Sequence, residues 1–408
     1  MKLKHDTDVL IVGAGPVGLF TALALHECGL SAQIVDKEQH GSVRSYAAAL
    51  HPGSLSLLNG YGLLPELQEH GHRVERIGVH DGNRRVGTME FSHLNVEFPF
   101  VLVVPQATFE EILMRRLSSL GIEVFWEHQA LGLDSGADGV EARIGRLEKI
   151  SKGYPVARAD WIIAKELSVK SRFVVGADGY HSFVRQRMGF EFQQTGKAET
   201  FAVYEFSGEI GSPTEAQVVF HNGTVSVFWP LGGDRGRWSF QVHPDERPDT
   251  TLEAMHELAR QRAQHCGITG RELHWTDSIS FERLLADRFG SERIWLAGDA
   301  AHVTGPVGAQ SMNVGLREAR DLALLIKSVE SEGAQLETLD RYEKARQEEW
   351  TGLLQGIPRP VGHGPDGLAG RGARLIPCIP ATGESMRELL DQIGFRLEQS
   401  PQEVGHGD

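Results

Sequence analysis

The sequence contains few cysteines. Only three occur among 408 residues, Cys28, Cys266 and Cys378, and no two of them form a CxxC pair. This odd, widely spaced set excludes a disulfide framework and does not match the ligand spacing of a zinc site. The histidines likewise show no ligand spacing. We therefore expect free thiols in a reducing compartment and no metal site.

Long apolar runs and an excess of positive charge are also missing. No segment is apolar over the length that a membrane span needs. The N-terminal run resembles a signal peptide, but Asp6, Asp8 and three glycines interrupt it. A formal charge of −14 leaves no basic surface for a polyanion. We therefore expect a cytoplasmic protein with no membrane span and no nucleic-acid partner.

A glycine-rich turn lies between two short apolar runs near the N-terminus. Residues 9–12 are typical of a buried parallel strand, and residues 32–35 of a second strand that leads into Asp36. The GxGxxG glycines between them are Gly13, Gly15 and Gly18. They permit a tight turn, close approach of a pyrophosphate and close helix packing, while Asp36 can accept ribose hydroxyls. This pattern predicts an adenosine dinucleotide site and leaves FAD and NAD open.

Two further motifs follow apolar strands. Residues 173–175 lead into Asp178 and Arg185, which alone would indicate only a turn and an exposed cation. Residues 294–297 lead into Asp299, a glycine-rich loop over 305–309 and a helix from Gln310. A carboxylate at the carboxyl edge of a sheet can bind the ribityl chain of a flavin. The helix N-terminus can stabilise the negative charge of reduced flavin.

Together the three motifs resemble those of the class A flavoprotein monooxygenases with the p-hydroxybenzoate hydroxylase fold. The motifs are GAGPVG at 13–18, GADGYHSFVR at 176–185 and GDAAHVTGPVGAQSMNVG at 298–315. The resemblance covers roughly the first 350 residues. It implies FAD as cofactor and NADPH or NADH as co-substrate.

The resemblance also implies roles for single residues. The glycines of the first motif and Asp36 would bind the ADP half of FAD, and Asp178 and Arg185 would contact FAD and help to dock the nicotinamide cofactor. The other flavin contacts would be Arg44, Gln106, Asp299, Pro306, Gly308, Gln310, Met312 and Asn313. His302 is expected to be a local hydrogen-bonding residue, with a proton relay as the alternative.

The sequence departs from the family pattern at four positions. Gly53 stands where an arginine is expected, and this difference could alter how the nicotinamide cofactor docks. Ala309 and Ser311 replace glycines of the commonest loop form, and Glu318 replaces an aspartate. None of these changes removes a group that the flavin chemistry needs.

We expect an α/β fold in which a doubly wound, Rossmann-like FAD-binding domain is interleaved with an antiparallel β-sheet substrate domain and followed by C-terminal helices. Period-two alternation with turns at 211–213, 222–223 and 232–233 predicts the antiparallel sheet. The expected boundaries are 1–75, 102–185 and 275–330 for the FAD-binding domain, 76–101 and 186–274 for the sheet domain, and 331–408 for the C-terminal extension.

The resemblance implies a monooxygenase that uses NAD(P)H and O2 to hydroxylate or epoxidise its substrate through a C4a-hydroperoxyflavin. The substrate is expected to be a neutral, aromatic or polyketide-like molecule, because no cationic clamp is evident along residues 224–229. One face of that strand, Thr224, Ser226 and Phe228, is the candidate substrate surface, but either face could meet the cavity and packing surface on both faces is the favoured alternative.

Other functions stay open. A two-component flavoprotein such as a halogenase is one, although the WxWxIP element of tryptophan-type halogenases is absent. An isoprenoid-type reductase of the same fold and a flavin-binding regulator without turnover are others. The sequence leaves the oligomeric state open, with a homodimer as one option.

Overall fold

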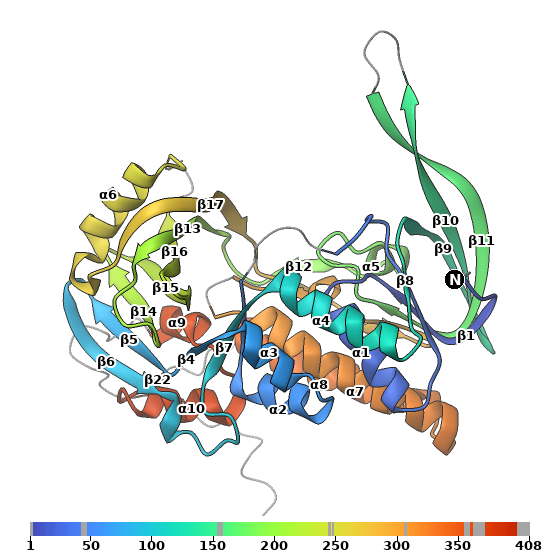
Figure 1. Cartoon of the computed structure of the whole chain (residues 1–408). Helices are drawn as coiled ribbons and strands as arrows, with labels where there is room; N and C mark the ends of the chain where they lie inside the picture. The colour runs from blue at the N-terminus through green and yellow to red at the C-terminus, as the bar shows by residue number, and fades with distance from the viewer. Residues whose placement is uncertain are drawn as a thin grey trace, which may run out of the picture.

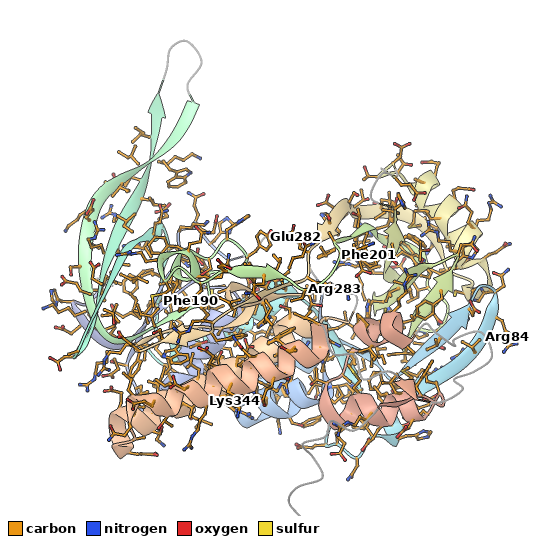
Figure 2. The ribbon with its side chains drawn as sticks, turned by 180° about the vertical axis from the view of Figure 1, so that it is seen from behind. Arg84, Phe190, Phe201, Glu282, Arg283 and Lys344 are labelled. Carbon is orange, nitrogen blue, oxygen red and sulfur yellow. The ribbon has the colours of Figure 1, made fainter. Side chains whose placement is uncertain are left out.

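The chain forms two sheet-based bodies that lie side by side (Figure 1). A computed structural model describes residues 3–41, 47–152, 158–243, 246, 249–305, 308–354, 360–361 and 372–397. Figure 2 shows Glu282 and Arg283 in the connection between the two bodies, where Arg283 donates to the Glu199 carboxylate at 2.7 Å. The expected α/β fold with an additional antiparallel sheet is confirmed.

The first body is built on a parallel sheet. Its parallel strands are β20 (Ile294–Leu296), β11 (Arg158–Gly176), β1 (Asp6–Val12), β2 (Ala32–Val35) and β8 (Val124–Phe125), adjacent in that order. The apolar residues 9–12 are almost completely buried, as expected of a parallel strand covered on both faces. Helix α1 (Pro16–Glu27) packs against α4 (Gln106–Ser119) and α7 (Gln310–Glu332).

A long antiparallel arm extends this sheet. It consists of β9 (His128–Gly136), β10 (Gly139–Lys152) and β11, which continues from the arm into the parallel sheet. In Figure 1 the arm projects away from both bodies. The sequence analysis predicted the inner end of β11 but not the arm.

The second body is a seven-stranded, mainly antiparallel sheet. Its order is β17 (Thr269–Phe281), β13 (Glu199–Glu209), β16 (Arg235–Val242), β15 (Thr224–Gly232), β14 (Glu215–His221), β5 (Arg76–Asp81) and β6 (Arg84–Glu90). The two faces of the sheet pack in two separate cores. One core lies under helix α6 (Leu252–Arg262), and the other faces the C-terminal segment and the first body.

Small elements close the remaining edges. Strands β3 (Ala47–Leu50), β7 (Val101–Pro105) and β4 (His72–Val74) form a three-stranded sheet in that order. Helices α2 (Pro52–Gly60) and α3 (Leu64–His70) lie between β3 and β4 along the chain. Strands β12 (Phe192–Gln194), β18 (Leu284–Ala286) and β21 (His302–Val303) form another three-stranded sheet, and β19 (Gly290–Ser291) pairs with β20. The short helix α5 (Phe183–Arg187) begins within the second motif.

The C-terminal part divides between the two bodies. Helix α8 (Asp340–Leu354) buries Tyr342 and Trp350 in the first core, although its charge pattern is that of a surface helix. Helices α9 (Gly372–Leu375) and α10 (Gly383–Asp391) pack on the second sheet. The short strands β22 (Pro360–Val361) and β23 (Arg396–Leu397) pair with each other. Among the residues described, no helix has the length and apolar character of a membrane span.

Candidate active site

The first glycine turn has the shape of a phosphate-binding loop. Gly13 has a φ of +106°, and a Cβ atom there would lie 2.3 Å from the Ala177 carbonyl oxygen. A Cβ at Gly18 would lie 2.0 Å from the Gly13 carbonyl oxygen, whereas one at Gly15 would meet no atom within 4 Å. The first and third glycines are thus required by the protein's own packing. The second borders open space that a pyrophosphate can enter.

Asp36 follows β2 at the edge of this loop. Its Oδ2 atom accepts a hydrogen bond from the Ala14 N–H at 2.7 Å, and its Oδ1 atom accepts from the Glu38 N–H at 2.9 Å. Helix α1 starts at Pro16 without a side-chain cap or an acidic residue in its first turn. Its N-terminus is therefore available to an anion. These groups fit the ADP half of FAD.

The second motif joins the first motif to the third. Asp178 Oδ1 accepts from the Ser182 hydroxyl at 2.5 Å, and Oδ2 accepts from the Val184 N–H at 3.1 Å. Burial raises the pKa of the Asp178 carboxyl, although these hydrogen bonds oppose the shift. Arg185 donates to the Ala300 carbonyl at 2.8 Å and to the Tyr180 carbonyl at 2.9 Å. Contacts of Asp178 and Arg185 with either nucleotide stay a prediction.

The third motif begins with an exposed carboxylate. Asp299 lies in the 3-10 helix η3 (Gly298–Ala300), directly after the strand end, and its Oδ1 atom accepts from the Ser311 hydroxyl. Ala309, the residue before α7, has a φ of +50°. The left-handed region at Ala309 is favourable for glycine and costs another residue about 1–2 kcal/mol.

Replacing Ala309 by glycine should therefore raise the free energy of unfolding, by up to about 1 kcal/mol after the greater entropy of the unfolded chain is included. Urea unfolding of the two proteins measures this difference. Ala323→Gly, within α7, is the matched control and should lower stability by about 1 kcal/mol or more, because alanine is favoured inside a helix. Equal losses in both variants would contradict a strained Ala309.

Two residues predicted at the flavin ring, Gly308 and Asn313, contact other parts of the protein, and their contact with flavin stays a prediction. A Cβ at Gly308 would lie 2.3 Å from the Pro377 carbonyl oxygen. Asn313 accepts from the His51 N–H at 2.8 Å and donates to the Ala49 and Ala309 carbonyls at 2.7 and 2.6 Å. Neither residue lines the cavity described below. Their contacts hold in place the loop whose other residues line it.

His51 supports the same loop and was not identified from the sequence. Its Nε2 atom lies 2.8 Å from the Gly308 carbonyl oxygen, so this nitrogen carries the proton. Burial lowers the pKa of His51 to about 3, although the bond to Gly308 opposes the shift, and the ring is neutral near pH 7. The sequence feature that could have pointed to His51 is Pro52. A proline marks the first turn of a helix, here α2, and restricts the backbone conformation of the residue before it.

A cavity of about 250 Å³ lies between this loop and the second sheet. Asp299, Gln310 and Met312 line its flavin-loop wall, together with Gln106 from the start of α4. Gln106 also donates to Glu110 Oε1 at 2.7 Å, and Gln310 to the Ile379 carbonyl at 3.3 Å. Two other predicted flavin contacts, Arg44 and Pro306, lie outside the described residues.

The sheet wall of the cavity contains a charged pair between two indole rings. The strand register places Trp275 of β17, Glu205 of β13, Arg237 of β16 and Trp229 of β15 in one row. Arg237 Nη2 donates to Glu205 Oε2 at 2.8 Å, and Arg235 donates to the other carboxylate oxygen. Trp229, Arg237 and Trp275 line the cavity. Residues 224–229 themselves carry no cationic group, as the sequence analysis noted, and Arg237 reaches the cavity from the neighbouring strand β16.

The predicted substrate surface is on the wrong face of β15. Phe228 packs in the core under α6, and Ser226 is fully buried with no hydrogen bond from its Oγ atom among the described residues. Thr224 donates to the His221 carbonyl within the hairpin. Because alternate residues of a strand point to opposite faces, the other face, which includes Trp229, meets the cavity.

His302 belongs to a buried network behind the loop. Its Nε2 atom lies 2.8 Å from Glu318 Oε2, and its ring stacks on Trp350 with centroids 3.8 Å apart. Glu318 also accepts from the Gly298 N–H at 2.8 Å and the Trp350 indole N–H at 2.9 Å. Burial alone would raise the pKa of Glu318, but His302 and these donors together lower it. His302 is completely buried and touches no substrate space, which fits a structural role.

Comparison with known proteins agrees with this geometry. The profile of the FAD binding domain family matches residues 6–356. The chain is 29% identical, over 87% of its length and 68% of the relative's, to an uncharacterized aromatic compound monooxygenase of Bacillus subtilis (strain 168). Across the first curated relatives it spans 59–70% of the relative's length.

Two solved structures share the fold. p-Nitrophenol 4-monooxygenase from Pseudomonas putida DLL-E4 superimposes with a TM-score of 0.75 at 22% identity, covering 97% of this chain and 100% of that one. Aklavinone-11 hydroxylase, solved with FAD and aklavinone, gives 0.69 at 24% identity, covering 87% and 70%. Because the profile of the FAD binding domain family matches most of the sequence, the chain belongs to that family, and the relatives and solved structures that it resembles are named as aromatic monooxygenases and hydroxylases.

Proposed function

We propose that this FAD-dependent monooxygenase is a single-component enzyme that uses NADPH or NADH and O2 to hydroxylate or epoxidise an aromatic or polyketide-like molecule. The observation that carries the proposal is the cavity between the flavin-type loop and the row formed by Trp229, Arg237 and Trp275. A cytoplasmic location, homodimer formation and the domain boundaries given above belong to the same proposal.

FAD would be held along all three motifs. Gly15 and the start of α1 bind the pyrophosphate, Asp36 the adenosine ribose, and Asp299 the ribityl chain. When bound, FAD accepts a hydride from the nicotinamide and activates O2 for transfer of one oxygen atom to the substrate. Helix α7 has no side-chain cap and no acidic residue in its first turn, so its N-terminus stabilises negative charge on the ring.

The substrate wall combines apolar contact with positive charge. Trp229 and Trp275 offer indole surfaces to an aromatic ring and exclude water from it. Arg237 pairs with Glu205, whose other carboxylate oxygen accepts from Arg235, and it brings a guanidinium group to the wall. We therefore expect a substrate with a phenolate or carbonyl oxygen directed at Arg237. The likeness to enzymes whose names give p-nitrophenol and aklavinone supports this choice.

The test follows anaerobic reduction of the bound flavin by NADPH and by NADH, with and without a panel of phenols and polyketide-like aromatics. We expect slow reduction that one class of compound accelerates, followed in air by incorporation of an atom from ¹⁸O2 into the product. Failure of both nucleotides to reduce the flavin would favour a two-component enzyme. Reduction without oxygen incorporation would favour a reductase.

Replacing Arg237 by methionine should raise KM for the accepted substrate by about 10–100-fold, the value of a hydrogen bond to a charged group. FAD affinity should stay unchanged, because the side chain belongs to the second sheet. Arg235→Met removes a neighbour of the same carboxylate that does not line the cavity, and it should change KM about twofold at most. Steady-state kinetics of both variants test the assignment, and equal effects would refute it.

A further inference from the structure

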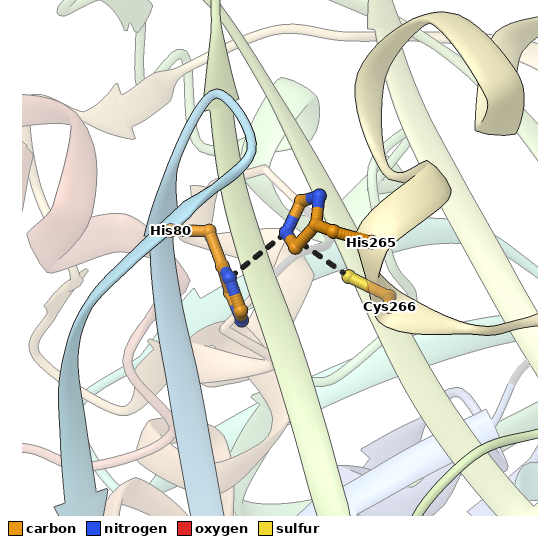
Figure 3. Close-up of side chains that lie close together, drawn as sticks. All are labelled: His80, His265 and Cys266. Atoms are coloured by element: carbon orange, nitrogen blue, oxygen red, sulfur yellow. Dashed lines mark hydrogen bonds between the residues drawn. The ribbon is translucent and has the colours of Figure 1, made fainter.

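Three side chains with metal-binding atoms meet on the second sheet, away from the flavin site. His80 lies in β5, and His265 and Cys266 form the end of the short 3-10 helix η2 (Gln264–Cys266). His80 Nδ1 is 2.8 Å from His265 Nε2, and Cys266 Sγ is 3.5 Å from the same Nε2 (Figure 3). All three donor atoms lie within 4.8 Å of one another.

The outer nitrogen of His80 is fixed by a neighbour. His80 Nε2 lies 2.8 Å from Gln217 Oε1, so Nε2 carries the proton and Nδ1 directs its lone pair at the cluster. A hydrogen bond of this kind orients metal-ligating histidines in proteins. His80 is buried, and burial lowers its pKa to about 4. Because His80 Nδ1 carries no proton, His265 Nε2 donates to it across the 2.8 Å contact, and binding of an ion at Nε2 would move that proton to Nδ1 of the same ring.

We propose that His80, His265 and Cys266 bind one Zn²⁺ ion, with water as the fourth ligand. Two imidazoles and one thiolate suit a borderline-soft divalent ion with tetrahedral preference. Zn–N and Zn–S bonds of about 2.1 and 2.3 Å put tetrahedral N and S ligands about 3.5 Å apart, which is the observed Sγ–Nε2 separation. Tetrahedral Zn–N bonds of about 2.1 Å put two nitrogens about 3.4 Å apart, so the two histidine nitrogens would have to part by about 0.6 Å.

Proton release and the missing hydrogen bond of one ligand limit the affinity of this site for Zn²⁺. Cys266 would bind as the thiolate: the S–H bond breaks, a Zn–S bond forms and one H⁺ is released. His265 Nδ1 is buried without a hydrogen-bond partner in the described part of the chain. His265 thus lacks a hydrogen bond on the nitrogen that points away from the cluster, whereas His80 has one to Gln217. We therefore expect weaker affinity than a closed four-ligand structural site has.

The position of the cluster indicates a structural role. His80 and Gln217 lie on the α6 side of the sheet, because Ile77, Val79 and Val218 face the other core. The flavin cavity opens on that other side. A bound ion would tie β5 to the connection between α6 and β17, segments 185 residues apart in the chain. Spacing along the sequence could not reveal such a site.

The experiment measures zinc in the purified flavoprotein after loading with Zn²⁺ and passage over a chelating resin. We expect one Zn²⁺ per chain and a higher melting temperature in the loaded protein. Co²⁺ substitution should give the intense long-wavelength d–d bands of a tetrahedral site, in a region where oxidised flavin does not absorb. These readouts do not depend on turnover, so they test the site separately from the proposed function.

Matched variants decide the assignment. Cys266→Ser and His265→Asn should lose the retained zinc, whereas Cys28→Ser, which removes a free thiol at the end of α1, should keep it. Gln217→Leu should bind about 10–100-fold more weakly, since it removes only the outer hydrogen bond. No zinc in the loaded wild type, or equal zinc in the Cys266→Ser variant, would overturn the proposal.

Discussion

Replacing Gly15 by alanine should leave the apoprotein folded and weaken FAD binding by about 100-fold or more, which corresponds to about 2.7 kcal/mol. A Cβ atom at this position meets no protein atom within 4 Å, so the apo structure has room for it. The same space is where the pyrophosphate must approach the backbone of the turn. Titration of apoprotein with FAD, followed by flavin fluorescence, measures the loss, and thermal unfolding of the apoprotein checks the fold.

Substitutions of two other glycines serve as controls for this result. Gly13→Ala should prevent normal folding, because the new Cβ would collide with the Ala177 carbonyl and the residue has a φ of +106°. Gly60→Ala, at the end of α2, also meets no neighbouring atom and should change neither stability nor FAD affinity appreciably. Wild-type FAD affinity in the Gly15→Ala protein would mean that the phosphates lie elsewhere.

Features set by local sequence were predictable. The glycine pattern specifies a strand–turn–helix unit, and the tight position of Gly18 against the Gly13 carbonyl lies within that unit, whereas the clash that a side chain at Gly13 would make is with Ala177 of the second motif. The alternating segments likewise indicated the antiparallel sheet, because periodicity is a property of each strand alone. Which residues of each strand face the cavity was not predictable in the same way.

The substrate wall depends on register between strands. Glu205 and Arg237 are neighbours only because β13 and β16 pair antiparallel with these residues opposite each other. Alternation shows that β15 has two faces but not which one meets the flavin loop, and Phe228 was therefore assigned to the wrong one. The C-terminal segment posed the same problem, since the contact of Gly308 with Pro377 joins residues distant in the chain.

The buried network around Glu318 gives a large expected effect on stability. Three donors surround its carboxylate: the Gly298 N–H, His302 Nε2 and the Trp350 indole. Glutamine at this position would direct an NH2 group at one of them. Removing one partner from a buried charged network typically costs about 3–5 kcal/mol, so Glu318→Gln should lose that much in urea unfolding at pH 7. Glu337→Gln on the exposed η4 (Leu336–Leu339) is the control and should change little.

The pH dependence of that difference identifies its cause. Burial alone would raise the pKa of Glu318, but His302 and the two N–H donors lower it below its ordinary 4.5. A carboxyl whose folded pKa is depressed stabilises the fold above its unfolded pKa, and this stabilisation is lost as the pH falls through the folded pKa. The stability gap between wild type and Glu318→Gln should therefore be full at pH 7 and narrow below about pH 4.5. A gap that stays constant into acid would point to lost packing, because packing does not depend on the charge of the carboxylate.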